Sequence, residues 1–139
     1  MGGAGAQGCG PMSDMVRLEH GVRAPGQARR WLVQRCHKWD CDALADPAAL
    51  MITELVTNVF LHARTDCVIH AAFNPPTLAV SVSDEDGQEL SRRGEPSSTA
   101  EDGRGLAIVA ALADAWGIQH ADGTKSVWFH LSNTEQPHA

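Results

Sequence analysis

The sequence has no excess of positive charge. It contains 11 basic and 17 acidic residues, which gives a formal net charge of −6 at pH 7. Nucleic acids and anionic lipid surfaces attract proteins through clustered Lys and Arg. The charge balance therefore argues against direct binding to nucleic acid or to a membrane. It does not argue against a phosphate-containing ligand, because such a site needs positive potential only locally.

The sequence also lacks long apolar runs and the common metal motifs. Its longest apolar runs, such as 106–113, are far too short to span a bilayer. No HExxH pattern occurs among the seven histidines, and no cysteine pair has CxxC spacing. These absences predict a cytoplasmic protein with reduced thiols at Cys9, Cys36, Cys41 and Cys67.

The length of 139 residues and the 43% hydrophobic content suit one folded domain. Residues 1–13 are rich in Gly and Ala without the basic start and apolar stretch of a signal peptide. We expect a disordered lead over 1–13, a single domain over 14–132 and a tail over 133–139.

Apolar spacing predicts an α+β domain. A polar segment, 86–102, interrupts the predicted elements and has the composition of a long functional or disordered loop. Short turns between neighbouring strands predict a mainly antiparallel, mixed sheet, and helices grouped on one face make a two-layer sandwich. The predicted helices are 27–39, 46–63 with Asp46 as N-cap residue, and 104–116 ended by Gly117; the predicted strands are 15–18, 67–73, 78–83, 118–121 and 125–131.

Glu54, Asn58 and His62 recur every fourth residue, so they share one face of the second predicted helix. The amide oxygen of Asn58 is a hard ligand that suits Mg²⁺, and Glu54 could accept a proton from a hydroxyl or from water. Taken alone, the pattern fits an ordinary exposed helix face equally well.

Two further features follow in the chain. Asp84 ends an alternating strand, where it could accept a hydrogen bond from an exocyclic amine or serve as a turn residue. Gly103, Arg104 and Gly105 come directly after the polar segment and open the third predicted helix. Glycines at a helix start let backbone amides approach phosphates. Arg104 could contact a phosphate or point to water.

The order of these features resembles the Bergerat-fold (GHKL) ATPases, a superfamily that includes gyrase, histidine kinases and bacterial anti-sigma-factor serine kinases. Residues 54–63, ELVTNVFLHA, resemble the N box of that family. VSDEDG at 82–87 and GRGLAIV at 103–109 resemble its two glycine boxes, and GTKSVWF at 123–129 resembles its closing strands. The resemblance covers about 16–131 and is nearest to the anti-sigma-factor kinase branch.

The resemblance implies a role for each matching position. It implies that Asn58 coordinates Mg²⁺, that Glu54 is the catalytic base, and that Asp84, supported by Thr124, binds the adenine amine. It implies a lid over 86–102 that closes on ATP. The other positions that it places around the nucleotide are His62, Gly87, Gly103, Arg104, Gly105 and Leu106.

One departure concerns the first glycine box, which commonly reads Asp-x-Gly-x-Gly. Asp86 and Gln88 stand at the two glycine positions, and Gly87 between them could compensate after a one-residue shift. The departure keeps open a binding module with weak or structural nucleotide binding. The leading hypothesis is a serine/threonine protein kinase that uses Mg-ATP to phosphorylate an anti-sigma-factor antagonist and also binds a sigma factor, with a homodimer as one expected assembly. An ATPase with water as acceptor is the third alternative.

Overall fold

The computed structural model describes residues 11–85, 99–121 and 123–133, with the side chains of 99–105 excepted. Within these ranges a five-stranded sheet has the order β1-β2-β3-β5-β4. All four strand pairings are antiparallel, so the predicted sheet is confirmed without a parallel component. The strands are β1 Met12–Leu18, β2 Cys67–Asn74, β3 Thr77–Asp84, β4 Ala115–Ala121 and β5 Thr124–Ser132.

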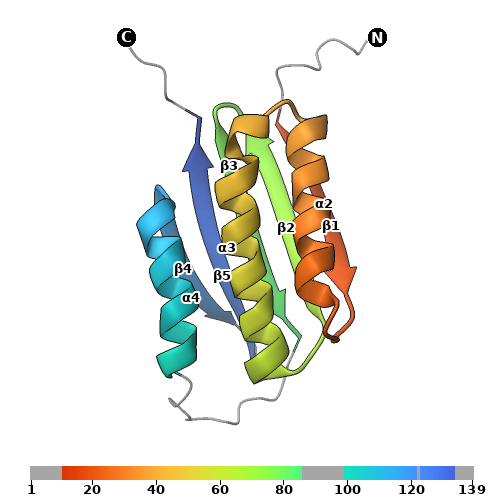
Figure 1. Ribbon diagram of the computed structural model, residues 1–139, viewed down its shortest axis with the longest axis vertical. Coiled ribbons are helices and arrows are strands. Elements are labelled where there is room, and N and C mark those ends of the chain that lie inside the picture. Colours follow the sequence, from red (N-terminus) through yellow and green to blue (C-terminus); the bar gives the residue numbers. More distant parts are fainter. Residues whose placement is uncertain (1–10, 86–98, 122, 134–139) are drawn as a thin grey trace.

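Three α-helices cover one face of this sheet (Figure 1). They are α2 Ala24–Lys38, α3 Ala45–Asn58 and α4 Thr99–Leu112. A 3₁₀ turn, Asp42–Leu44, leads into α3, and a π-helical turn, Val59–Ala63, extends it. Helix α3 packs against both α2 and α4 and contacts β3. The α+β, two-layer architecture predicted from the sequence is therefore confirmed.

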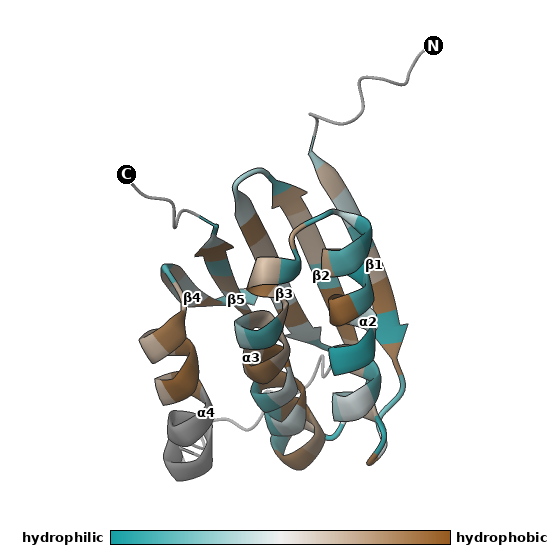
Figure 2. Cartoon of the chain, turned by 45° about the horizontal axis from the view of Figure 1, so that its top comes forward, coloured by the Kyte–Doolittle hydropathy of each residue, from teal (hydrophilic) through white to brown (hydrophobic). Residues whose placement is uncertain are grey.

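The core follows from simple periodicities. Along β3, Leu78, Val80 and Val82 are buried while the residues between them are partly exposed, as expected for a strand with one covered face. Along α2, every fourth residue is buried, from Ala24 to Cys36. Figure 2 shows hydrophilic residues along the side of α2 that is turned away from the sheet. These two faces meet to form the hydrophobic core.

The end of the third helix is where the sequence-based prediction was wrong. Helix α4 begins at Thr99 and ends at Leu112, whereas Trp116 and Gly117 belong to strand β4. The backbone N–H of Asp114 already donates to the carbonyl of His130 on β5 at 2.8 Å. Pairing with β5 therefore decides the conformation of 115–117, and Gly117 does not end a helix.

The start of the second helix also differs from the prediction. Asp46 is not the N-cap residue, because α3 begins at Ala45 and Asp46 lies in its first turn. The preceding 3₁₀ turn buries Leu44 and carries the chain into the helix. A carboxylate in the first turn still interacts favourably with the helix dipole.

The helical stretch Asp42–Ala63 is 22 residues long and passes a length-and-composition test for a membrane-spanning helix. Its buried residues, which include Met51, Ile52 and Leu55, belong to the hydrophobic core. It lies between α2 and α4 on the sheet (Figure 1). It is therefore a core helix of this domain.

Candidate functional site

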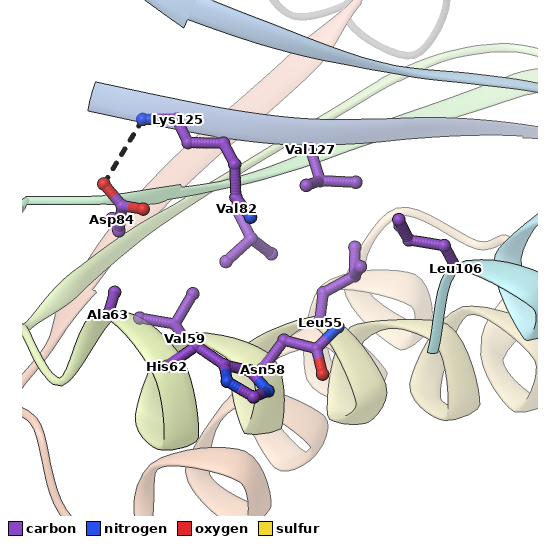
Figure 3. Close-up of a pocket in the computed structure, with 10 residues that line it drawn as sticks. All are labelled: Leu55, Asn58, Val59, His62, Ala63, Val82, Asp84, Leu106, Lys125 and Val127. Atoms are coloured by element: carbon purple, nitrogen blue, oxygen red, sulfur yellow. Dashed lines mark hydrogen bonds between the residues drawn. The ribbon is translucent and has the colours of Figure 1, made fainter. Parts of the chain in front are cut away.

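A pocket lies between the C-terminal half of α3 and the sheet (Figure 3). The empty space between its walls is about 430 Å³, a figure that includes space open to solvent. Its polar groups come from α3 with its π-helical extension and from the ends of two strands. Its lining residues are Leu55, Asn58, Val59, His62, Ala63, Val82, Asp84, Leu106, Lys125 and Val127.

The helical wall of the pocket is shaped by the wide turn after Asn58. The N–H of Arg64 donates to the carbonyl of Val59 at 2.8 Å, five residues back, and Arg64 ends the helix in the left-handed region at φ 59. Such π-helical turns are rare and occur frequently at functional sites. Here the turn presents Val59, His62 and Ala63 to the pocket beside Asn58.

The strand wall carries a buried carboxylate. Asp84 is the last residue of β3 and is only 7% exposed. Its Oδ1 accepts a hydrogen bond from the backbone N–H of Lys125 on the neighbouring strand at 3.2 Å. A buried carboxylate is costly unless it is hydrogen-bonded. Asp84 is thus a buried, hydrogen-bonded polar group at one end of the pocket.

An ion-pair cluster lies next to Asp84, at the same end of the sheet. The guanidinium of Arg17 on β1 contacts Asp66 at 2.6 Å and Glu85 at 3.1 Å. The hydrogen bond to Glu85 raises the pKa of Arg17. The N–H of Glu85 in turn donates to the Thr65 hydroxyl at 3.1 Å. These contacts connect β1 to the residue that precedes β2 and to the residue that follows β3, directly beside Asp84.

The structure brings several of the predicted residues together. Asn58 and His62 line the pocket from the helix, Asp84 lines it from the end of β3, and Leu106 lines it from α4 (Figure 3). These residues are far apart in the chain, so their convergence is a property of the fold.

Other predicted positions lie elsewhere. Glu54 is half-buried one turn before Asn58, but it does not line the pocket. Gly87 lies outside the described residues. The Gly103–Gly105 backbone lies inside α4 and not at its start, because the helix begins at Thr99. The prediction that these glycines open the helix was therefore wrong.

Lys125 is the polar pocket residue that the sequence analysis missed. Val127, Phe129 and Leu131 of β5 are buried against the helices, and alternation places Lys125 on the same face. Thr124 therefore falls on the opposite face, and Lys125, not Thr124, lines the pocket. The alternation of β5 was the signal that could have identified it.

The family model for the histidine kinase-like ATPase domain matches residues 17–131. The chain therefore belongs to the histidine kinase-like ATPase family, whose domain binds ATP.

A solved structure of the RsbU and RsbW domains of Rv1364c from Mycobacterium tuberculosis is similar in fold. Its TM-score is 0.65 and its sequence identity 20%, over 87% of this chain and 32% of that one. The chain thus spans about a third of the length of that protein. No curated protein was found to match the chain.

Proposed function

We propose that this chain is a serine/threonine protein kinase that binds Mg-ATP in the pocket and phosphorylates an anti-sigma-factor antagonist. The observation that carries the proposal is the convergence of Asn58 and Asp84 on one pocket from opposite walls. The two groups suit the two ends of a nucleotide: a carboxylate for an amine-bearing base and an amide oxygen for a phosphate-bound cation.

The base end of the proposed site is the Asp84 end. Val59, Val82 and Val127 supply apolar walls of the pocket. A planar base can stack between such walls while its exocyclic amine donates to Asp84. Because the carboxylate is buried and bonded to the β5 backbone, it would be preorganised for that hydrogen bond, which lowers the entropic cost of binding.

The donor set fits Mg²⁺ at the other end. Asn58 offers a hard oxygen from the pocket wall, and Mg²⁺ typically takes one or two protein ligands together with waters and phosphate oxygens. When bound, the ion would neutralise phosphate charge. Leu106 belongs to this phosphate end, as do the residues carried over from the family, Gly87, Gly103, Arg104 and Gly105. The lid that the resemblance implies over 86–102 belongs here too; its part 86–98 lies outside the described residues, and 99–102 belong to α4.

Glu54 is the proposed base. It lies one helical turn before Asn58, beside the proposed phosphate end. In the transfer step, the hydroxyl oxygen of the partner Ser or Thr bonds to the γ-phosphorus and the bond to the bridging oxygen of ADP breaks. Glu54 takes the hydroxyl proton. Positioning and charge neutralisation contribute most of the rate enhancement in such reactions.

The partner assignment rests on the family resemblance and on the RsbW domain in the similar structure. We propose a sigma factor and its antagonist as partners, a cytoplasmic location and a homodimeric assembly.

The proposal is tested by nucleotide titration. Calorimetry with Mg-ATP should show binding by the wild type, and Asp84→Asn should weaken it about tenfold to a hundredfold, because a hydrogen bond to a charged group is lost. Asp46→Asn, on the exposed first turn of α3, is the matched control and should bind as the wild type does. Equal affinity of Asp84→Asn and wild type would refute the adenine assignment.

Transfer is measured with labelled ATP and candidate antagonist proteins. Glu54→Gln should lower the transfer rate by about a hundredfold or more while leaving ATP affinity nearly unchanged. Unchanged transfer would exclude Glu54 as the base. A wild type that binds ATP but neither transfers phosphate to an antagonist nor releases it to water would instead support the binding-module alternative.

A further inference from the structure

Lys125 places a cation inside the pocket next to Asp84. Its side chain extends from β5 into the cavity, between the sheet and α3 (Figure 3). Its own backbone N–H is the group that donates to the Asp84 carboxylate. The two side chains therefore lie on neighbouring strands, at the same end of the pocket and on the same face of the sheet.

The ammonium of Lys125 makes no ion pair with any residue in the part of the chain that the structure describes. The pocket walls next to it are the apolar side chains of Val59, Val82 and Val127. Lys side chains usually extend their charged end to water. An ammonium group that points between apolar walls suits a ligand that brings hydrogen-bond acceptors.

We infer that Lys125 is a specificity-determining residue that reads the purine base: Asp84 accepts from the exocyclic amine, and Lys125 donates to a ring nitrogen beside that amine. The inference rests on the proposed function. A carboxylate has only acceptors and an ammonium has only donors. Together they match the edge of adenine, where the N6 amine lies between the acceptors N1 and N7.

The position of Lys125 favours the base over the phosphates. Lys125 lies beside Asp84, whereas the proposed cation ligand Asn58 lies on the opposite, helical wall. Thr124, which the family resemblance places near the adenine, is on the other face of β5. Lys125 therefore takes the place beside the base that the resemblance gives to that threonine.

The test measures the binding of adenosine and Mg-ATP to the wild type and to three variants. Lys125→Met keeps most of the side-chain length and removes the donor, whereas Lys125→Arg keeps a charged donor. Lys38→Met is the matched control, because the only other lysine is exposed at the end of α2. Thermal unfolding of each variant confirms that it is folded.

We expect Lys125→Met to weaken adenosine and ATP equally, by about tenfold to a hundredfold. Lys125→Arg should recover part of the loss, and Lys38→Met should bind as the wild type does. Adenosine analogues with carbon at N1 or at N7 extend the test. At least one should bind the wild type more weakly than adenosine does, and Lys125→Met should not distinguish that analogue from adenosine.

Three results would overturn the inference. Unchanged affinity of Lys125→Met would show that the ammonium contacts no part of the nucleotide. A loss confined to ATP, with adenosine unaffected, would assign Lys125 to the phosphates. A wild type that binds neither ligand would overturn the proposed function as well, whereas the first two results leave ATP binding by the wild type intact.

Discussion

Gly117→Ala is predicted to destabilise the domain through a single collision on the helix-free face of the sheet. Gly117 on β4 pairs with Trp128 on β5. A Cβ at Gly117 would lie 2.7 Å from Cζ2 of Trp128 and 2.9 Å from both Cε2 and Nε1. Ordinary contacts begin at 3.4 Å. The indole would therefore have to move by about 0.7 Å relative to that Cβ. The ring of His130 packs against it, with the two ring centroids 4.9 Å apart.

Two opposing effects set the magnitude. Overpacking of this kind costs about 1–3 kcal/mol. Replacing glycine by alanine also restricts the unfolded chain, which stabilises the fold by about 0.4–1 kcal/mol where the backbone is compatible. The backbone is compatible here, because Gly123 is the only described glycine with positive φ. The collision is the larger effect, and we expect a net loss of about 1–2 kcal/mol.

Urea unfolding measures this loss. With a slope of about 2 kcal/mol per M, the midpoint should fall by about 0.5–1 M. Gly21→Ala is the matched control: its added Cβ meets no atom within 4 Å, so its midpoint should stay equal or rise. In a double-mutant cycle with Trp128→Leu, the two changes should couple by about 1 kcal/mol. A Gly117→Ala domain as stable as the wild type would refute the close packing on which the argument depends.

Two further stability changes follow from the structure. Burial raises the pKa of the Cys67 thiol from 9.0 to about 11, so the unfolded chain ionises first. The contribution of the neutral Cys67 thiol to the free energy of unfolding should be fully present below about pH 9. It should fall by about 2–3 kcal/mol as the pH rises toward 11. Urea titrations in reductant should show that Cys67→Ala lessens this alkaline loss, and an equally steep loss in the variant would contradict the assignment. Asp40 follows α2 in the left-handed region at φ 61, where the N–H of Cys41 donates to the carbonyl of Cys36 at 2.8 Å. Asp40→Gly should raise stability by about 0.5–1 kcal/mol and Asp40→Ala should lower it; the opposite order in thermal unfolding would count against a helix-capping role for this turn.

Much of the fold could be predicted because local periodicity reports burial. The spacing of apolar residues identified α2 and α3, and alternation identified β2 and β3 to within one residue at most of their ends. The order of the motifs around Asn58, Asp84 and Gly103 also indicated the family that the matched family model shows. These features could be predicted from the sequence because each motif or periodic pattern is formed by residues that are neighbours in the chain.

The boundary between α4 and β4 could not be predicted from local periodicity. Residues 115–117 continue an apolar segment that could be a helix or a strand, and hydrogen bonding to β5 decides between them. The π-helical turn after Asn58 could not be predicted from local pattern either, because no residue in 59–63 has an intrinsic preference for a hydrogen bond to the fifth residue back.

The sequence by itself therefore determined the elements, the approximate family and most of the polar residues of the site. Only the tertiary structure decided that Asp84 is buried, that Asn58 and His62 line the same pocket, and that Lys125, not Thr124, lines it as well. The physical reason is sheet register: the pairing of Ser83 with Ser126 sets Lys125 beside Asp84, and a shift of one residue would turn the lysine to the opposite face.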